Sequence, residues 1–396
     1  MIAEALLGMG ETALEMTARK RVLLVFGTRP EAIKMAPVYQ ALCAEPQAFE
    51  PICCVTAQHR RLLDHALATF GIVPDIDLGL MRAGQQPEET AAAVLAGVSE
   101  ALRQVSPDLV LVHGDTTTTM AAALATFYAG IALGHVEAGL RSDDLRAPFP
   151  EEFNRRLTSL AARYHFVPTQ SGQDNLLREG CDPASIHVTG NTVVDALLQV
   201  AARLDRDGAL ASAIARELVE TLGFDWQRER FVLVTCHRRE AFGQGLEAIC
   251  AAVAHLAETF TDVRFVLPVH PNPVVQQAVA SRLGGRPRIH LTAALRYEAC
   301  VGLLQACHFV LTDSGGLQEE APSLGKPVLV MREVTERPEA IAAGCAALVG
   351  VDAGTIVAAA GRLLNDPLVY SDMVATANPY GDGRAALRIA EVLRTC

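Results

Sequence analysis

The sequence repeats one pattern along its length: a short apolar run typical of a buried strand, then a longer stretch with helical spacing. In the first half the strand-like runs are residues 21–26, 51–57, 108–115, 132–139 and 164–169. The segment 58–72, between two of these runs, is amphipathic with the period of a helix. Strands that alternate with helices form βαβ units with parallel strands. The sequence therefore predicts an α/β protein.

The pattern starts again in the second half, which indicates a second domain. Its strand-like runs are residues 230–240, 263–270, 288–293, 308–316, 327–339 and 346–350. With 396 residues the chain is too long for one ordinary core. We predict an N-terminal extension (1–20), a first Rossmann-like domain (21–188) and a second one (189–377), with a C-terminal helix (378–396) that crosses back to the first. The two domains would face each other across a cleft, with their strand carboxyl ends on either side.

Charge and composition exclude several classes of partner. The formal net charge is −11 and the pI is about 5.5, so no overall field attracts nucleic acid or an anionic membrane. The longest apolar stretch, 120–134, is shorter than the roughly 18 residues of a membrane span. Ten cysteines without paired C-x-x-C spacing indicate reduced thiols rather than disulfides or zinc ligands. We therefore expect a cytoplasmic protein. No H-E-x-x-H motif, EF-hand or cysteine–histidine cluster occurs and no P-loop follows a predicted strand, so we predict neither a metal nor a nicotinamide cofactor.

The segment 309–330 carries a candidate anion site. A predicted strand ends at Asp313, and Ser314, Gly315 and Gly316 begin a helix whose free N–H groups and positive dipole end favour an anion. Glu320, one turn further on, is placed to accept hydrogen bonds from sugar hydroxyls. The structural alternative is an ordinary N-cap followed by a solvated pair of glutamates.

Three basic residues follow predicted strands and are candidates for holding the same anion. They are Arg29, Lys34 and Arg337. The turn that contains Arg29 lacks the glycine-rich fingerprint of dinucleotide-binding proteins, so a basic side chain would have to bind the phosphate there. Arginine binds phosphate as a fork and lysine as a point charge. Taken singly, each residue is more often a partner in a surface ion pair.

Three separated carboxylates are expected to converge at adjacent strand ends. Asp115 and Glu137 each end a strand-like run, and Glu151 opens a helix after two prolines. Carboxylates that cluster in a desolvated cleft raise one another's pKa, which suits acid and base chemistry near neutral pH. His237 adds a group that titrates in the same range. Singly, each carboxylate is better explained as a cap or an ion-pair partner.

At this point the motifs themselves resemble a known family. They are FGTRPEAIKMAP, TAQHR, VHGDTTTT, GHVEAGLR, PEEFNRR, TGNTVVDAL, HRRE, LTDSGGLQEEAPSLGKPVLVMREVTERPE and NPYGDGRA. In this order, from about residue 21 to the C-terminus, they resemble the non-hydrolysing UDP-N-acetylglucosamine 2-epimerases of bacteria. The resemblance implies a fold of the glycosyltransferase B type, usually as a homodimer. It also implies interconversion of UDP-GlcNAc and UDP-ManNAc, by anti elimination of UDP to a 2-acetamidoglucal and re-addition after carbon 2 is reprotonated from the other face.

The resemblance also assigns roles to residues. The family's catalytic positions correspond to Asp115, Glu137, Glu151 and His237, and which carboxylate removes the carbon 2 proton stays open. Its UDP-binding positions correspond to Arg29, Lys34, Ser314, Gly315, Gly316, Glu320 and Arg337. A second site, where UDP-GlcNAc acts as an activator in bacterial members, corresponds to Gln58, Arg238 and His270. Two positions depart from the family: Arg61 replaces a common glutamine, and Cys300 replaces the aromatic residue that usually meets the uracil.

Several other functions remain open at this stage. One is a glycosyltransferase of the same fold, which would need an acceptor channel. Others are an epimerase of a related UDP-sugar, such as the 2,3-diacetamido glucuronic acid type, and a hydrolysing epimerase that releases free ManNAc. A non-catalytic nucleotide-sugar sensor is the non-enzyme alternative. For the favoured activity, the product would supply ManNAc for cell-surface polysaccharide synthesis.

Overall fold

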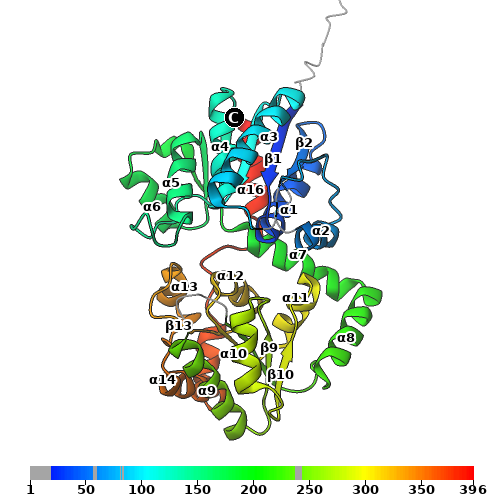
Figure 1. Cartoon of the computed structure of the whole chain (residues 1–396), viewed down its shortest axis with the longest axis vertical. Helices are drawn as coiled ribbons and strands as arrows, with labels where there is room; N and C mark the ends of the chain where they lie inside the picture. Colours follow the sequence, from blue (N-terminus) through cyan, green and yellow to red (C-terminus); the bar gives the residue numbers. More distant parts are fainter. Residues whose placement is uncertain (1–18, 57–59, 81, 83, 237–242) are drawn as a thin grey trace, which may run out of the picture.

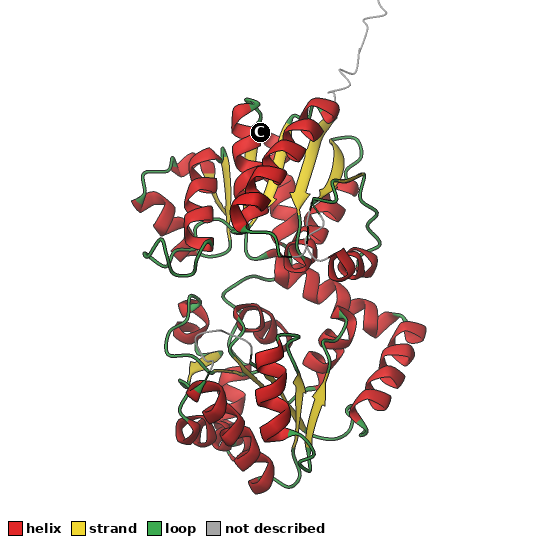
Figure 2. Cartoon of the chain, viewed as in Figure 1, coloured by secondary structure: helices red, strands yellow, loops and turns green. Residues whose placement is uncertain are grey.

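The chain forms two α/β domains, each built on a parallel sheet (Figure 1). The structure, a computed structural model, describes residues 19–56, 60–80, 82, 84–236 and 243–396. Figure 2 shows the strands in the middle of each domain with helices around them. The predicted α/β class with two Rossmann-like domains is confirmed. Residues 1–18 of the predicted extension lie outside the described part.

The first sheet has seven parallel strands in the order β3-β2-β1-β4-β5-β6-β7. Its strands are β1 (Lys20–Phe26), β2 (Phe49–Val55), β3 (Ile76–Asp77), β4 (Leu109–His113), β5 (Ala132–Val136), β6 (Tyr164–Val167) and β7 (Ile186–Val188). The helices of this half are α1 (Arg29–Cys43), α2 (Arg60–Thr69), α3 (Pro87–Val105), α4 (Thr117–Tyr128), α5 (Glu151–Ala161) and α6 (Gln170–Arg178). The strand order reverses between β1 and β4, where open sheets of this kind bind ligands.

The second sheet has six parallel strands in the order β10-β9-β8-β11-β12-β13. Its strands are β8 (Phe231–Thr235), β9 (Arg264–Pro268), β10 (Ile289–Thr292), β11 (Val310–Thr312), β12 (Val328–Val330) and β13 (Ala346–Leu348). Its helices are α9 (Gln244–Thr259), α10 (Pro273–Leu283), α11 (Tyr297–Ala306), α12 (Gly315–Glu320), α13 (Pro338–Ala343), α14 (Ala353–Asn365) and α15 (Pro367–Val374). The reversal between β8 and β11 repeats that of the first sheet.

The domains are joined by helices that pack at their boundary. After β7, α7 (Thr192–Arg206) runs along their boundary and packs on α1 of the first domain and on α11 and α12 of the second (Figure 1). It leads into α8 (Gly208–Leu222), and the last helix, α16 (Ala385–Thr395), returns to pack on α1 and α7. We propose that the boundary between the domains lies between residues 188 and 189, because β7 ends at Val188 and β8 belongs to the second sheet.

The strands of the first sheet are apolar because helices cover both faces. Residues 22–26 of β1 are fully buried, as expected for a central parallel strand. The two strands that were not predicted, β3 and β7, have only two and three residues and lie at the sheet edges. Among the helices of the described part, none is long and apolar enough to cross a bilayer.

A buried carboxylate joins the starts of α1 and α4 beneath the strand ends. Glu31, 2% exposed, accepts hydrogen bonds from the backbone N–H groups of Gly27 and Thr28 at 3.0 and 2.7 Å. Thr28 completes the capping box by accepting from the Glu31 N–H. The other Glu31 oxygen accepts from the hydroxyls of Thr116 and Thr119 at 2.7 and 3.1 Å. The turns after β1 and β4 are therefore fixed relative to each other.

The segment after β5 packs against α6 at a glycine contact. Gly139 has a φ of +88°, and a Cβ at this position would lie 2.4 Å from the carbonyl oxygen of Gly172. An L side chain is therefore excluded twice, by backbone conformation and by a clash with rigid backbone.

We predict that Gly139→Ala destabilises the protein by about 3 kcal/mol, the sum of a left-handed backbone and overpacking. Urea unfolding followed by far-ultraviolet circular dichroism measures the change. Gly180→Ala is the matched control, because Gly180 has a φ of +85° but open space around it. It is expected to cost about 1 kcal/mol, from the left-handed backbone alone. Equal losses in the two variants would contradict the packing argument.

Candidate active site

A cavity of about 480 Å³ lies at the carboxyl ends of the first sheet's strands, between the two domains. Its charged and titratable lining residues are Glu31, Lys34, His113, Asp115, Glu137, Glu151, Arg155, Glu336 and Arg337. The structure thus brings together the three predicted carboxylates and two of the three predicted cations. Glu336 and Arg337 come from the second domain, between β12 and α13, so the cavity is part of the interdomain cleft.

Glu137 and Lys34 form a buried ion pair at the centre of this cavity. Glu137 follows β5 with a φ of +62°, a conformation that costs free energy for a residue other than glycine. The Lys34 ammonium on α1 donates to the Glu137 carboxylate, and the two side chains are 12% and 8% exposed. Burial acts to raise the pKa of Glu137, but Lys34 and His113 hold it well below its usual range. Glu137 is therefore ionised at neutral pH.

Asp115 and Glu151 face the same cavity from β4 and α5. Arg155 donates to Oδ2 of Asp115 at 2.5 Å, and Asn154 donates to the Asp115 carbonyl at 2.9 Å. The Asp115 side chain keeps 28% exposure. Oε2 of Glu151 is buried and has no hydrogen-bond partner among the described residues. Asp115 is thus held in place, while Glu151 has an oxygen available for a ligand.

Glu319 of the second domain, which sequence analysis missed, completes the charge network. It is 1% exposed and accepts from Nε of Arg337 at 2.8 Å, while Lys34 of the first domain lies 3.7 Å from its Oε2. Burial acts to lower the pKa of both Lys34 and Arg337, but Glu319 and Glu137 raise it above the usual value in each case. Both cations are therefore charged. No sequence pattern separated Glu319 from its neighbour Glu320, because adjacent helical residues differ only in the direction they face.

The predicted anion site lies at the start of α12. Ser314 is the N-cap of this six-residue helix, and Gly316 has space beside it, with the nearest atoms to a Cβ being side-chain oxygens of Glu320 and Ser314 at 3.7 and 3.9 Å. Oε1 of Glu320 accepts from the Tyr297 hydroxyl at 2.9 Å. Burial raises the pKa of Glu320 to about 7. The alternative of a solvated glutamate pair is wrong, because Glu319 is 1% exposed and paired with Arg337.

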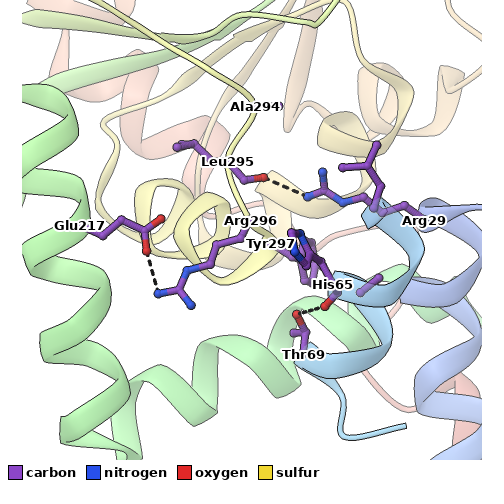
Figure 3. A pocket seen from close by; sticks show the side chains of 10 residues that line it. Arg29, His65, Thr69, Glu217, Ala294, Leu295, Arg296 and Tyr297 are labelled. Carbon is purple, nitrogen blue, oxygen red and sulfur yellow. Dashed lines mark hydrogen bonds and ion pairs between the residues drawn. The ribbon is translucent and has the colours of Figure 1, made fainter. Parts of the chain in front are cut away.

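Arg29 lies apart from the other two predicted cations. Its guanidinium donates to the carbonyl oxygen of Leu295 at 3.3 Å, across the cleft from α1 (Figure 3). It lines a separate cavity of about 390 Å³, bordered by α2, α8 and the segment before α11. Cys300 and Tyr297 line a smaller apolar cavity of about 90 Å³ that also contacts Glu320.

Some predicted residues fall where the structure gives little or no description. His237, Arg238 and Gln58, as well as the side chain of Arg61, lie outside the described residues. His270 follows β9, and its Nδ1 accepts from the backbone N–H of Asn272 at 3.2 Å.

The other histidines of the described residues do not assemble a metal centre. His135 and His165 are buried on β5 and β6, and burial lowers their pKa to about 3 and about 4, which keeps both neutral. Nε2 of His113 lies 3.6 Å from Oε2 of Glu137, so this residue belongs to the charge network. Within the described ranges, no three His, Cys, Asp or Glu side chains are grouped to hold a metal ion.

Comparisons with known proteins agree on one family. The family model described as UDP-N-acetylglucosamine 2-epimerase matches residues 41–394. The UDP-N-acetylglucosamine 2-epimerase of Escherichia coli (strain K12) is 52% identical over 375 residues, which are 94% of this chain and 98% of that protein. The probable UDP-N-acetylglucosamine 2-epimerase of Ralstonia nicotianae is 51% identical over 375 residues, 95% of this chain and 99% of that protein.

Solved structures extend the agreement to the fold. The crystal structure of UDP-GlcNAc 2-epimerase from Neisseria meningitidis bound to UDP-GlcNAc matches with a TM-score of 0.89 and 42% sequence identity. The match covers 95% of this chain and 100% of that chain. The glycosyltransferase SnogD from Streptomyces nogalater matches with a TM-score of 0.56 over 95% of this chain and 99% of its own. At 16% sequence identity, this likeness shows a shared fold alone. The predicted fold of the glycosyltransferase B type is thereby confirmed. The chain belongs to the UDP-N-acetylglucosamine 2-epimerase family.

Proposed function

We propose that this protein interconverts UDP-GlcNAc and UDP-ManNAc by elimination and re-addition of UDP. The observation that carries the proposal is the interdomain cavity, in which Asp115, Glu137 and Glu151 lie together with Lys34 and Arg337. A relative that is 52% identical to this chain is named UDP-N-acetylglucosamine 2-epimerase, and the structure of the Neisseria meningitidis relative contains bound UDP-GlcNAc. Carboxylates beside paired cations are the groups that proton transfer next to a departing diphosphate requires.

The chemistry explains why both kinds of group are needed. The proton on carbon 2 of the sugar is not next to a carbonyl, so it is too weakly acidic for simple removal and return. When UDP leaves from carbon 1, the electrons of the carbon 2–hydrogen bond form the double bond of a 2-acetamidoglucal. One carboxylate takes that proton, a second group delivers a proton to the opposite face, and UDP returns to carbon 1.

The residues divide between these tasks. Glu137 is ionised and fixed by Lys34, which suits a base or an electrostatic stabiliser. Glu151 has an unpaired buried oxygen that suits proton delivery. Asp115, held by Arg155, completes the set.

We propose that cations and the start of α12 bind the leaving diphosphate. Arg337 and Lys34 now pair with Glu319 and Glu137, and a diphosphate would offer them further oxygens. The backbone at Ser314, Gly315 and Gly316 is proposed to contact phosphate oxygens. Arg29, whose Nη2 donates to the Leu295 carbonyl, and His237 are proposed to act at the same diphosphate. Glu320 is proposed to bind the ribose hydroxyls.

The wider context is proposed from the same resemblance. We propose a homodimer, with an activator site for UDP-GlcNAc that includes Gln58, Arg238 and His270. We further propose that the product supplies ManNAc for cell-surface polysaccharide synthesis. All ten cysteines are free thiols, which supports the reducing cytoplasm as the compartment.

The deciding experiment is proton NMR of the purified protein with UDP-GlcNAc in deuterated water. The expected result is UDP-ManNAc with deuterium at carbon 2, because the proton exchanges with solvent during elimination. Free ManNAc as the main product would mean a hydrolysing enzyme. Saturable binding without turnover would mean a sensor or an enzyme for another UDP-sugar, and either result would overturn the proposal.

We predict that Glu137→Gln and Asp115→Asn each lower kcat by about 10²- to 10⁴-fold, the usual contribution of a positioned acid or base. The rate at which UDP-ManNAc forms at saturating UDP-GlcNAc gives kcat. Glu100→Gln, on the exposed side of α3, is the control and is expected to keep the activity. Activity within threefold of the unmodified protein in both site variants would remove these residues from the chemistry.

We predict opposite effects of Glu320→Gln on stability and on substrate binding. Since the folded pKa of Glu320 is about 7, above that of an unfolded glutamate, the folded state disfavours the charged carboxylate, and stability is lost as pH rises from about 4.5 to 7. The variant should therefore raise Tm at pH 8 and change it little at pH 4.5. KM for UDP-GlcNAc should rise about tenfold, because a charged acceptor for the ribose hydroxyls is lost. A Tm gain of the same size at both pH values would contradict the assigned pKa.

A further inference from the structure

Asn191 lies where the chain crosses between the domains in both directions. It sits between β7 of the first domain and α7, and its backbone N–H donates to the carbonyl of Tyr380 at 2.7 Å. Tyr380 belongs to the return segment that leads from α15 to α16. The neighbouring Gly190 has a φ of +91°, and a Cβ there would lie 3.4 Å from the Tyr380 carbonyl oxygen. The two crossings are therefore packed directly against each other at Asn191.

The Asn191 side chain has two separate functions at this point. Its Oδ1 accepts from the backbone N–H of Val193 at 3.0 Å, which caps the start of α7. Its Nδ2 donates to Oε2 of Glu137 at 2.9 Å and to Oε2 of Glu319 at 3.2 Å. Asn191 is 2% exposed, so water does not replace either contact. One amide thus bridges a carboxylate of the first domain and a carboxylate of the second.

The surroundings show why a neutral donor is needed there. The charged or titratable groups that face Glu137 are Lys34 on α1, His113 on β4, and Arg337 and Glu319 from the second domain. Two carboxylates that approach a common point repel each other unless donors lie between them. Lys34 supplies one such donor, and the Asn191 amide supplies the other. An acidic residue at position 191 would instead add a third negative charge.

We propose that Asn191 is a positioning residue that keeps Glu137 and Glu319 together as anions and so links the relative placement of the two domains to the chemistry at Glu137. This inference rests on the proposed epimerase function. Asn191 acts through Glu137 and touches no reacting atom.

The test uses a substitution that keeps the cap but replaces the amide donor with a carboxylate, and a second one that removes the donor without adding charge. Aspartate is as good an N-cap as asparagine and has nearly the same shape, so Asn191→Asp preserves the start of α7. Asn191→Ser also keeps a capping oxygen but adds no charge. The measurements are kcat/KM for UDP-GlcNAc between pH 3 and 9, so that the scan extends below the usual pKa of a glutamate, and Tm between pH 5 and 8.

We expect Asn191→Asp to lower kcat/KM at pH 7.5 by about 100-fold or more. The acidic limb of the pH profile should also move upward by about one pH unit, because a like charge disfavours ionisation of Glu137. Asn191→Ser should lose about tenfold in kcat/KM, with a smaller displacement of the limb. A role limited to capping α7 predicts unchanged profiles in both variants. An Asn191→Asp protein with the activity and acidic limb of the unmodified chain would overturn the proposal.

The Tm series separates this proposal from the proposed function. If the unmodified protein does not epimerise UDP-GlcNAc, the proposed function fails, and the Tm values still decide the role of Asn191. The clustered carboxylates predict that Asn191→Asp falls further below the unmodified protein in Tm as pH rises from 5 to 8. A Tm difference that stays constant with pH would overturn the electrostatic role.

Discussion

The buried charge cluster between the domains is the interaction on which the rest of the site depends. Lys34 of the first domain contacts Glu137 beside it and Glu319 across the cleft, and Arg337 closes the cluster from the second domain. Buried ion pairs contribute little net stability, because desolvation offsets most of their attraction. Such a cluster is better explained by function: it places two cations and an ionised carboxylate at one point between the domains.

The scaffold fixes this cluster with uncharged contacts as well as charged ones. Glu31 ties the turns after β1 and β4 together, so Lys34 and Asp115 keep a constant relative position. Glu137 leaves β5 with a positive φ, and the glycine contact at Gly139 secures the segment behind it. Strain at a residue that faces a cleft is tolerated only where the surrounding packing holds it. The packing of the first sheet and its turns thus holds Glu137 and its charged neighbours in a conformation that these residues alone would not adopt.

Much of the architecture follows from patterns that are local in sequence. Runs with long apolar segments, such as 21–26 and 230–240, were predicted as strands because buried parallel strands are apolar on both faces. The strands β3 and β7 were missed because two or three residues at a sheet edge carry too little periodicity to detect. The placement of Arg29 was also beyond local patterns. Its position in the turn after a predicted strand indicated an anion shared with Lys34 and Arg337, but its guanidinium donates to the Leu295 carbonyl of the other domain.

The sequence determined the α/β class, the two successive sheets and the set of acidic and basic residues at strand ends, because periodicity and strand-end chemistry are encoded within short segments. The tertiary structure decided which of these residues meet. Glu319 joins Lys34, and Asn191 bridges Glu137 and Glu319, only because α7 and the return segment hold the two domains face to face. Contacts between residues more than fifty positions apart depend on how the sheets pack, which no short segment specifies.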